Sequence, residues 1–225
     1  MAKNMYDWVA DRRFNPIKGI CSHDCTYCYM RSYWPKMSEP RLDTVSLRRG
    51  LKGLKDKRPV FVGSGIDMWA EDIPGEWIVK VLERCKQYGL TYLFQSKNPE
   101  RFINYLEEDL FPEKIILGTT IETDRSGISK APSPYERSQS MNKIKELYPE
   151  IRRMVTIEPI IDFDHKRMIQ MMEWIQPEFV NIGADSKGHG LAEPSAEKLE
   201  QLIKDLEKIT EVRIKSNLGR LRREG

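Results

Sequence analysis

Three of the four cysteines lie within eight residues, in the segment GICSHDCTYCYM that spans Gly19–Met30. Three residues separate Cys21 from Cys25, and two separate Cys25 from Cys28. This spacing allows one loop to bring three thiolates to a single iron–sulfur cluster. Three cysteine ligands would leave one iron of a [4Fe–4S] cluster free to bind a small molecule. The spacing therefore predicts metal chemistry for this loop.

Two aromatic residues and a histidine accompany the cysteines. Tyr27 and Tyr29 flank Cys28 and could shield a cluster from water. His23 lies inside the loop, so a structural zinc site with three cysteines and one histidine is the alternative interpretation. Zinc sites usually draw their ligands as two separated pairs, which favours the cluster. Cys85 lies on the apolar face of a predicted helix, and we expect it to be a small buried hydrophobic residue.

The composition of the 225 residues is typical of a globular cytoplasmic protein. Hydrophobic residues make up 40% and charged residues 32%, and the net charge of +3 is too small to indicate nucleic-acid binding by itself. No apolar run approaches the ~20 residues of a membrane-spanning helix. The N-terminal segment MAKNMYDWVA lacks the apolar core of a signal peptide. Disulfides are rare in the cytoplasm, which again favours metal binding by the cysteines.

Short apolar segments alternate with amphipathic ones along the chain, which predicts a parallel α/β fold. The predicted strands share a buried run with glycine or polar residues at its end; they are Ile17–Ile20, Pro59–Gly65, Thr91–Ser96, Lys114–Glu122, Arg153–Ile160, Phe179–Asp185 and Glu211–Lys215. The predicted helices share caps or apolar stripes; they are Gly75–Tyr88, Asn98–Glu108, one from Ser133 to before Pro149, one after Asp164 and one from Ser195. Asp124–Pro132 is expected to be a loop on the face where the strands end.

About six βα units fit in the chain, which is fewer than the eight of a closed TIM barrel. We therefore expect one domain over residues 1–225, folded as a partial (β/α)6, TIM-like barrel. A doubly wound open sheet is the alternative. In both folds, ligands bind at the carboxyl ends of the strands.

Four of the predicted strands end in polar residues that should face inward. Side chains alternate along a strand, and helices cover the outside of a barrel, so the polar set belongs inside. Any one of these residues could instead be a solvated strand end. A buried carboxylate needs a partner, so together they predict a site for a zwitterionic nucleoside. The set is Gln95, Lys97, Thr120, Glu122, Thr156, Glu158, Asn181, Gly183 and Asp185.

The C-x3-C-x2-C pattern with an aromatic residue before its last cysteine resembles the signature of the radical S-adenosylmethionine (SAM) superfamily. Its position after the first strand of a βα series is also similar. The resemblance implies a [4Fe–4S] cluster on Cys21, Cys25 and Cys28, with SAM bound to the open iron. It implies an oxygen-sensitive enzyme that cleaves SAM reductively to a 5′-deoxyadenosyl radical, which abstracts hydrogen from a substrate. An external one-electron reductant of the flavodoxin or ferredoxin type is implied as a partner.

The same resemblance implies further contacts to the cofactor. Gly63, Ser64 and Gly65 lie where the superfamily carries a glycine-rich segment for the methionine amino group, although the usual Gly-Gly-Glu form is missing. Ser96 lies at a contact position too, but its parity is opposite to that of Gln95 and Lys97. The expected cofactor contacts are Tyr27, Gly63, Ser64, Gly65, Ser96, Lys97, Thr120, Glu122, Glu158, Gly183 and Asp185.

A narrower resemblance covers most of the chain. The segments NPIKG, SKNPERF, LGTTIE, IEPII, NIGAD and IKSNLGR resemble, in this order, a phage-associated radical SAM subgroup of largely unassigned function. The chain resembles spore photoproduct lyase more distantly. The subgroup resemblance supports the fold and implies no substrate.

Two basic stretches keep a role for nucleic acid open. Charge runs are usually solvated surface, but in a barrel these two could flank one opening and contact phosphates. The alternatives are therefore a radical SAM enzyme that repairs or modifies nucleic acid, and a non-catalytic, zinc-stabilised nucleic-acid-binding protein. Lys215 could hold an anionic substrate, and Trp69 could stack on a base, cover the site or plug the rim. The basic residues are Arg48, Arg49, Lys52, Lys55, Lys57 and Arg58, and then Arg213, Lys215, Arg220, Arg222 and Arg223.

Overall fold

Strands and helices alternate through most of the chain in the computed structural model, which describes residues 6–222. The main elements, in chain order, are β3 Val60–Val62, α2 Gly75–Lys86, β4 Tyr92–Ser96, α3 Glu100–Glu107, β5 Ile115–Thr120, α4 Pro134–Leu147, β6 Arg152–Ile157, α5 His165–Ile175, β7 Phe179–Ile182, α6 Ala196–Leu206 and β8 Glu211–Ile214. The predicted alternation of strands and helices is confirmed.

The central sheet has six strands, which are all parallel and follow the order β3-β4-β5-β6-β7-β8. A doubly wound sheet reverses its strand order at a switch point, and this sheet has no reversal, so that alternative is wrong. The sheet is open, since β3 and β8 do not pair with each other within residues 6–222. A mixed α/β fold with a parallel sheet is confirmed, and a closed barrel is not found.

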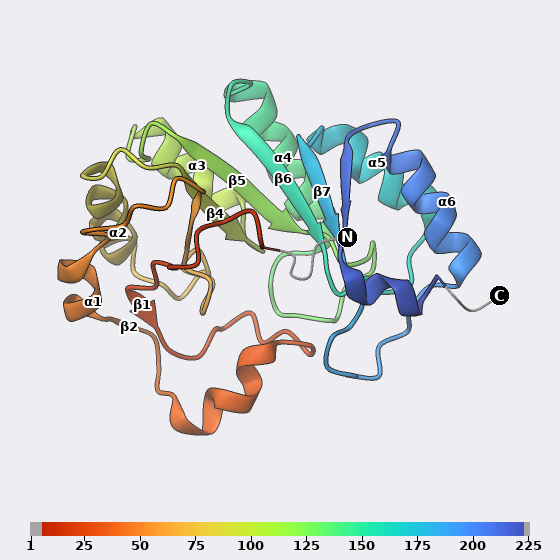
Figure 1. Ribbon diagram of the computed structural model, residues 1–225, viewed down its shortest axis with the longest axis horizontal. Helices are drawn as coiled ribbons and strands as arrows, with labels where there is room; N and C mark the ends of the chain where they lie inside the picture. Colours follow the sequence, from red (N-terminus) through yellow and green to blue (C-terminus); the bar gives the residue numbers. More distant parts are fainter. Residues whose placement is uncertain (1–5, 223–225) are drawn as a thin grey trace.

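The helices α2 to α6 lie along one side of the sheet, and the N-terminal segment lies on the other (Figure 1). The larger core, between sheet and helices, includes Leu117, Val155 and Val180. A smaller cluster on the opposite face joins Leu93, Ile116, Met154 and others to Val9, Tyr6 and Trp8 of the N-terminal segment. The alternation of buried residues along each strand therefore separates two faces.

The predicted first strand, Ile17–Ile20, is wrong as a member of the sheet. Only Ile17–Lys18 (β1) is extended, and it pairs antiparallel with Arg41–Leu42 (β2) in a separate ribbon. The preceding segment instead follows β3, with one parallel bridge between Phe14 and Val62. A single bridge is therefore found at the edge of β3, where we expected a complete strand.

Most of the predicted helix starts are confirmed. Ser133 and Glu136 form the capping box of α4, while the side chains of Asp164 and Ser195 cap α5 and α6. Asn98 does not cap α3, which begins at Glu100 after Pro99 and has no side-chain cap; the Asn98 amide instead donates to the carbonyl of Trp69 at 3.2 Å. The sequence could not show this contact, which depends on tertiary packing.

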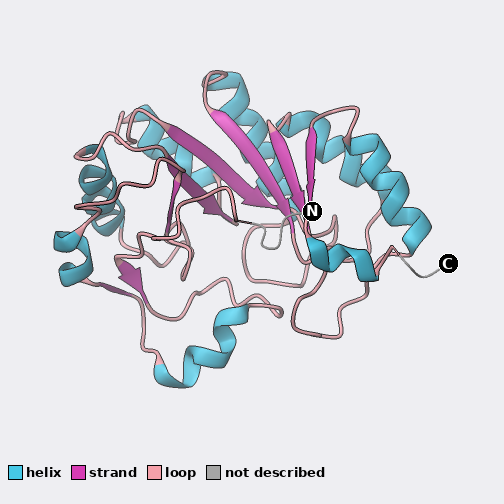
Figure 2. Cartoon of the chain, viewed as in Figure 1, coloured by secondary structure: helices cyan, strands magenta, loops and turns pink. Residues whose placement is uncertain are grey.

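Long loops fill the side of the molecule toward which the strand arrows point (Figure 2). They include the cysteine loop and the β5–α4 loop, where Asp124–Pro132 was expected as a loop. Shorter elements around them are two 3-10 helices, η1 Tyr29–Lys36 and η2 Ser216–Arg220, and the helix α1 Thr44–Arg49. None of the helices within residues 6–222 is long and apolar enough to cross a membrane.

Candidate active site

A cavity of about 680 Å³ at the carboxyl ends of the strands contains most of the predicted site. All three clustered cysteines line it, together with polar residues that follow β3 to β7. Nine of the eleven expected cofactor contacts line it directly: Tyr27, Gly63, Ser64, Gly65, Ser96, Lys97, Thr120, Glu158 and Asp185. Glu122 and Gly183 do not line it, and each lies behind a side chain that does.

The cysteine loop is fixed by backbone hydrogen bonds to the β5–α4 loop. The N–H of Thr26 donates to the carbonyl of Ile128 at 3.0 Å, and the N–H of Lys130 donates to the carbonyl of His23 at 2.7 Å. Inside the loop, the N–H of Cys28 donates to the carbonyl of Cys25 at 3.1 Å. The cysteine loop is therefore attached to the β5–α4 loop on both sides of Cys25.

The cysteine thiols are free and poorly solvated. Burial chiefly raises the pKa of Cys21, to about 12, and it raises the pKa of Cys25 as well. Both groups are therefore neutral thiols near pH 7 unless a cation is present. Coordination to a metal supplies that cation and deprotonates a thiol outright, so three thiols are chemically suited to iron, while within residues 6–222 no His, Cys, Asp or Glu group converges as a ready-formed site for a single metal ion. Cys85 lies in the apolar core on α2, as predicted.

Glu122 is the centre of a buried charge network. Its Oε2 accepts from Nη1 of Arg137 at 2.8 Å, and its Oε1 lies 3.6 Å from Nζ of Lys97. The hydroxyl of Tyr27 donates to the same carboxylate. Burial acts to raise the pKa of Glu122, but the charges of Lys97 and Arg137 outweigh it and hold that pKa below its usual value. Glu122 thus anchors Tyr27 of the cysteine loop to the strand ends.

Arg137 was missed by the sequence analysis, although it is fully buried and essential to this network. It also donates to the carbonyls of Thr120 and Pro132 and to the hydroxyl of Ser129. A signal existed in the sequence: Arg137, Met141 and Ile144 follow the i, i+4, i+7 spacing of a buried helical stripe. An arginine on such a stripe needs a buried acidic partner.

Asp67 was also missed as a site residue. Its carboxylate accepts from the hydroxyl of Ser96 at 2.9 Å and from the N–H of Lys97 at 2.8 Å, and it lies 2.9 Å from Nε2 of His23. Burial acts to raise the pKa of Asp67, but the attraction of His23 and backbone hydrogen bonds leave it lowered. Ser96 therefore supports the site through its hydrogen bond to Asp67. This contact explains why its parity is opposite to that of Gln95 and Lys97.

The ends of β6 and β7 are held by Glu158 and Asp185. Glu158 pairs with Nζ of Lys215, so Lys215 does point into the cavity. Gly183 lies under Glu158, where an added Cβ would be only 2.8 Å from the Glu158 carboxyl carbon. Asp185 accepts from Nδ1 of His189 at 2.7 Å and closes its own loop.

The floor of the cavity is a hydrogen-bonded chain on the inner face. The hydroxyl of Tyr6 donates to Oε1 of Gln95 at 2.9 Å, and Nε2 of Gln95 donates to Thr120 at 3.1 Å. Gln95 and Thr120 face inward as their parity predicts. Burial raises the pKa of Tyr6 to about 12, so this phenol stays neutral. Tyr6 precedes the motifs, and nothing in its local sequence indicated a place in the site.

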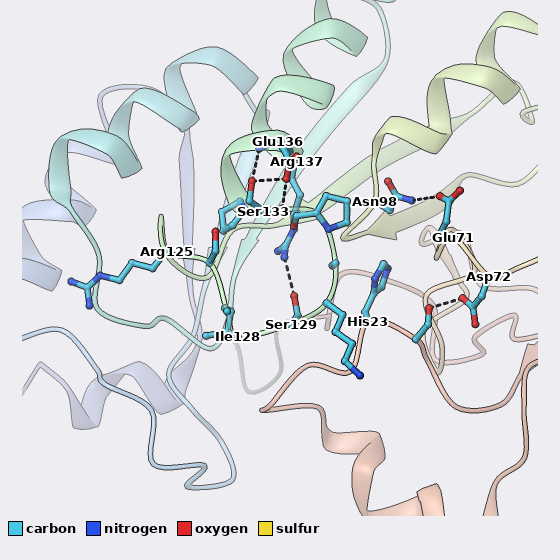
Figure 3. A pocket seen from close by; sticks show the side chains of 17 residues that line it. His23, Glu71, Asp72, Asn98, Arg125, Ile128, Ser129, Ser133, Glu136 and Arg137 are labelled. Carbon is cyan, nitrogen blue, oxygen red and sulfur yellow. Dashed lines mark hydrogen bonds between the residues drawn. The ribbon is translucent and has the colours of Figure 1, made fainter.

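A second cavity, of about 690 Å³, shares His23 with the first (Figure 3). Its polar groups already pair with one another: Ser22 with Asp72 at 2.5 Å, and Arg137 with Ser129 at 3.2 Å. Asn98 points at Glu71 (Figure 3). The cavity that contains the cysteines is therefore the better candidate for a catalytic site.

One expectation about another residue is wrong, and a second stays untested. Trp69 neither covers the site nor plugs the rim, because it is fully buried between Phe94, Phe102, Tyr105 and Phe111. The helix α1 and the segment after β8, which carry parts of the two basic stretches, lie far apart at opposite ends of the molecule (Figure 1), and the expectation that the stretches flank one opening stays a prediction. Among the C-terminal basic residues, Arg213 pairs with Glu211, Arg220 with Glu193 and Arg222 with Glu200; Arg223 lies outside the described residues.

Solved structures with a similar fold include a spore photoproduct lyase variant with bound AdoMet and a dinucleoside spore photoproduct. It matches with a TM-score of 0.65 and 10% identity over 90% of this chain and 75% of that chain. Streptococcus suis SuiB bound to S-adenosylmethionine matches with a TM-score of 0.60 and 11% identity over 92% of this chain. The match spans only 51% of that SuiB chain. Identities this low show a shared fold.

Comparison with curated protein sequences gives no match. The sequence profile of one family, described as a protein of unknown function (DUF5131), matches residues 4–205. This range includes the cysteine loop, the polar strand ends and all helices from α1 to α5. The chain therefore belongs to the DUF5131 family.

Proposed function

We propose that this chain is a radical SAM enzyme in which Cys21, Cys25 and Cys28 hold a [4Fe–4S] cluster. One observation carries the proposal: three free thiols from one loop line the same cavity as the polar ends of four parallel strands. The fold shared with spore photoproduct lyase and SuiB, which are radical SAM enzymes, supports it. The open parallel sheet with helices on one side is consistent with the partial (β/α)6 barrel of that superfamily.

A cluster suits the cysteine loop better than a single zinc ion. Four ligands around one zinc must lie within about 4 Å of each other, given Zn–S bonds near 2.3 Å. Within residues 6–222, no three His, Cys, Asp or Glu side chains converge in this way. His23, the expected fourth zinc ligand, lies against Asp67 instead. A cluster can spread its thiolates over several irons.

The residues of the chain have distinct roles in this proposal. When bound, the cluster would supply the electron that cleaves SAM to a radical able to abstract hydrogen from a substrate. Glu122, through Tyr27, holds the cysteine loop against the strand ends. Glu158 and Lys215 present charges near the end of β6, where a zwitterionic cofactor could be oriented. The rings of Tyr6 and Phe61 pack on each other, with 5.0 Å between their centroids, at the floor of the cavity.

The electron would come from outside the chain, from a one-electron reductant of the flavodoxin or ferredoxin type. Electron supply can be tested separately by replacing that partner with a chemical reductant. SAM would bind across Gly63, Ser64 and Gly65 at one end of the cavity and Asp185 at the other.

Anaerobic reconstitution tests the metal assignment. The wild-type protein should bind about four irons and four sulfides and turn brown, as the [4Fe–4S] assignment requires. Cys25→Ala should lose the cluster, whereas Cys85→Ala should keep it because Cys85 lies in the core, away from the loop. Full iron and sulfide loading in Cys25→Ala, or a colourless zinc protein, would refute the assignment.

A further inference from the structure

Most charged side chains that line the active-site cavity are paired. Lys97 faces Glu122, and Lys215 faces Glu158. Arg13 also lines the cavity, yet its Nη1 is buried and has no hydrogen-bond partner within residues 6–222. The Arg13 side chain as a whole is only partly buried, but a buried donor atom normally finds an acceptor, because leaving it unpaired is costly. The missing acceptor is therefore a feature to explain.

The carboxylates near Arg13 are engaged elsewhere. Asp56 accepts from Nη2 of Arg58 at 2.7 Å. Asp11 is 93% exposed, and its nearest cation is also Arg58, at 3.2 Å. Within residues 6–222 neither forms an ion pair with Arg13, so Asp11 and Asp56 act on its guanidinium only at longer range.

Two phenols also lie near Arg13, and both are neutral. Burial raises the pKa of Tyr6 to about 12, and it raises the pKa of Tyr29 too. Burial is the main cause that lowers the pKa of Arg13, but a guanidinium stays charged in proteins. The cavity wall therefore holds a positive charge that forms no direct ion pair within residues 6–222.

The position of Arg13 is set by the backbone beside it. The N–H of Phe14 donates to the carbonyl of Phe61 at 3.0 Å, and the N–H of Gly63 donates to the carbonyl of Phe14 at 3.0 Å. These two bonds attach the backbone of Phe14 to the β3 strand on either side of Val62. The backbone next to Arg13 is therefore fixed against β3, and Arg13 extends from it to the cavity wall.

We propose that Arg13 binds an oxyanion of the substrate, a phosphate or a carboxylate. A guanidinium presents paired donors that match such groups. Lys187 also lines the cavity and is exposed, so it could add a second, weaker contact. The substrate class is thus an anionic molecule with its charged group near Tyr6 and Tyr29.

The inference that the anion belongs to a substrate rests on the proposed function. The binding of an anion at Arg13 does not depend on it. SAM carries only one carboxylate, and the resemblance to radical SAM enzymes implies that SAM binds to the open iron of the cluster. The oxyanion at Arg13 should therefore belong to another molecule. The test must separate these two sources.

Equilibrium dialysis of the full-length protein with radiolabelled phosphate, at constant ionic strength and with SAM present, measures the site. Arg13→Met removes the charge and keeps an apolar stem. Arg12→Met is the matched control, because Arg12 instead donates to the carbonyls of Gly50 at 2.8 Å and Lys52 at 3.1 Å. We expect phosphate to bind at least tenfold more weakly to Arg13→Met and equally well to wild type and Arg12→Met.

Acetate competition identifies the preferred group. Displacement of phosphate by acetate at lower concentration would assign a carboxylate, and weak displacement would assign a phosphate; both outcomes support the site. Equal phosphate binding by wild type and Arg13→Met, including no binding by either, would overturn it. A loss of SAM affinity in Arg13→Met alone would also overturn it, because Arg13 would then serve the cofactor carboxylate.

Thermal melting separates a binding role from a structural one. Phosphate should raise the Tm of the wild type through linkage and leave that of Arg13→Met unchanged. Without phosphate, Arg13→Met should melt no lower than the wild type, because an unpaired charge stabilises nothing. A protein that binds phosphate through Arg13 but binds no cluster would refute the proposed function while leaving this anion site intact.

Discussion

At the scale of single residues, Glu122 and Arg137 form the most deeply buried ion pair of the site within residues 6–222. Both side chains are almost fully buried, so neither charge is solvated without the other. Removing one partner of a buried pair leaves an uncompensated charge, which typically costs about 3–5 kcal/mol. The pair also fixes Tyr27, and through it the cysteine loop.

Glu122→Gln should lower the free energy of unfolding by about 3 kcal/mol, by the reasoning for a broken buried pair. The double variant Glu122→Gln/Arg137→Met should lose less than the sum of the two single variants, because no unpaired charge remains. Urea denaturation measures both. Glu178→Gln is the control: it breaks the exposed pair with Arg152, for which about 0–1 kcal/mol is expected. Equal losses in Glu122→Gln and Glu178→Gln would contradict the buried-pair interpretation.

The same carboxylate should make stability depend on pH. The pKa of Glu122 in the folded protein lies below its ordinary value of 4.5. Its contribution is therefore fully present above about pH 4.5 and is lost as the pH falls through the folded pKa, since the unfolded chain then binds more protons. Between pH 5 and pH 3, roughly, the wild type should lose stability more steeply than Glu122→Gln. Parallel curves would show that Glu122 has no shifted pKa.

At the scale of elements, strand ends and capped helices position the site. The end of β7 depends on Gly183, because the Glu158 side chain occupies the space of a Cβ. The start of α4 depends on its capping box, which lies next to the loop that braces the cysteines. Small local features thus determine where the charged groups point.

Gly183→Ala should push Glu158 aside and disturb its pair with Lys215. We expect SAM to bind about tenfold more weakly, because small displacements of positioning groups have large effects. Gly219→Ala is the matched control, since no heavy atom lies within 4 Å of its Cβ position. SAM affinity by equilibrium dialysis and the Tm of each variant are the measurements. Unchanged SAM affinity in Gly183→Ala would remove Glu158 from the binding site.

Sequence reasoning was accurate where local chemistry decides the structure. The capping residues Ser133, Asp164 and Ser195 were predicted because caps depend on side chains within one turn. Inward parity at Gln95 and Thr120 followed from strand alternation alone. Asn98 and Trp69 were misjudged because each is held by residues distant in sequence. Arg13 and Tyr6 could not be found, since the N-terminal segment contains no motif and its packing on the inner face is tertiary.

At the scale of the whole molecule, one open sheet brings the proposed cluster ligands, SAM contacts and anion contact to the carboxyl ends of its strands. The sequential strand order brings the carboxyl ends of β3 to β7 together, and the cysteine loop lies across them. The N-terminal segment closes the inner face opposite the helices (Figure 1). This arrangement leaves a cavity that contains thiols, a charge network and the guanidinium of Arg13, whose Nη1 has no hydrogen-bond partner within residues 6–222.

Reductive cleavage of SAM by the reconstituted protein is the most direct measurement. With dithionite and SAM under anaerobic conditions, the wild-type protein should form 5′-deoxyadenosine and methionine, detected by chromatography with mass spectrometry. Cys25→Ala should form neither, while Cys85→Ala should form both. Absence of both products in a wild-type protein with a full complement of iron and sulfide, even when anionic candidate substrates are added, would contradict the proposed function.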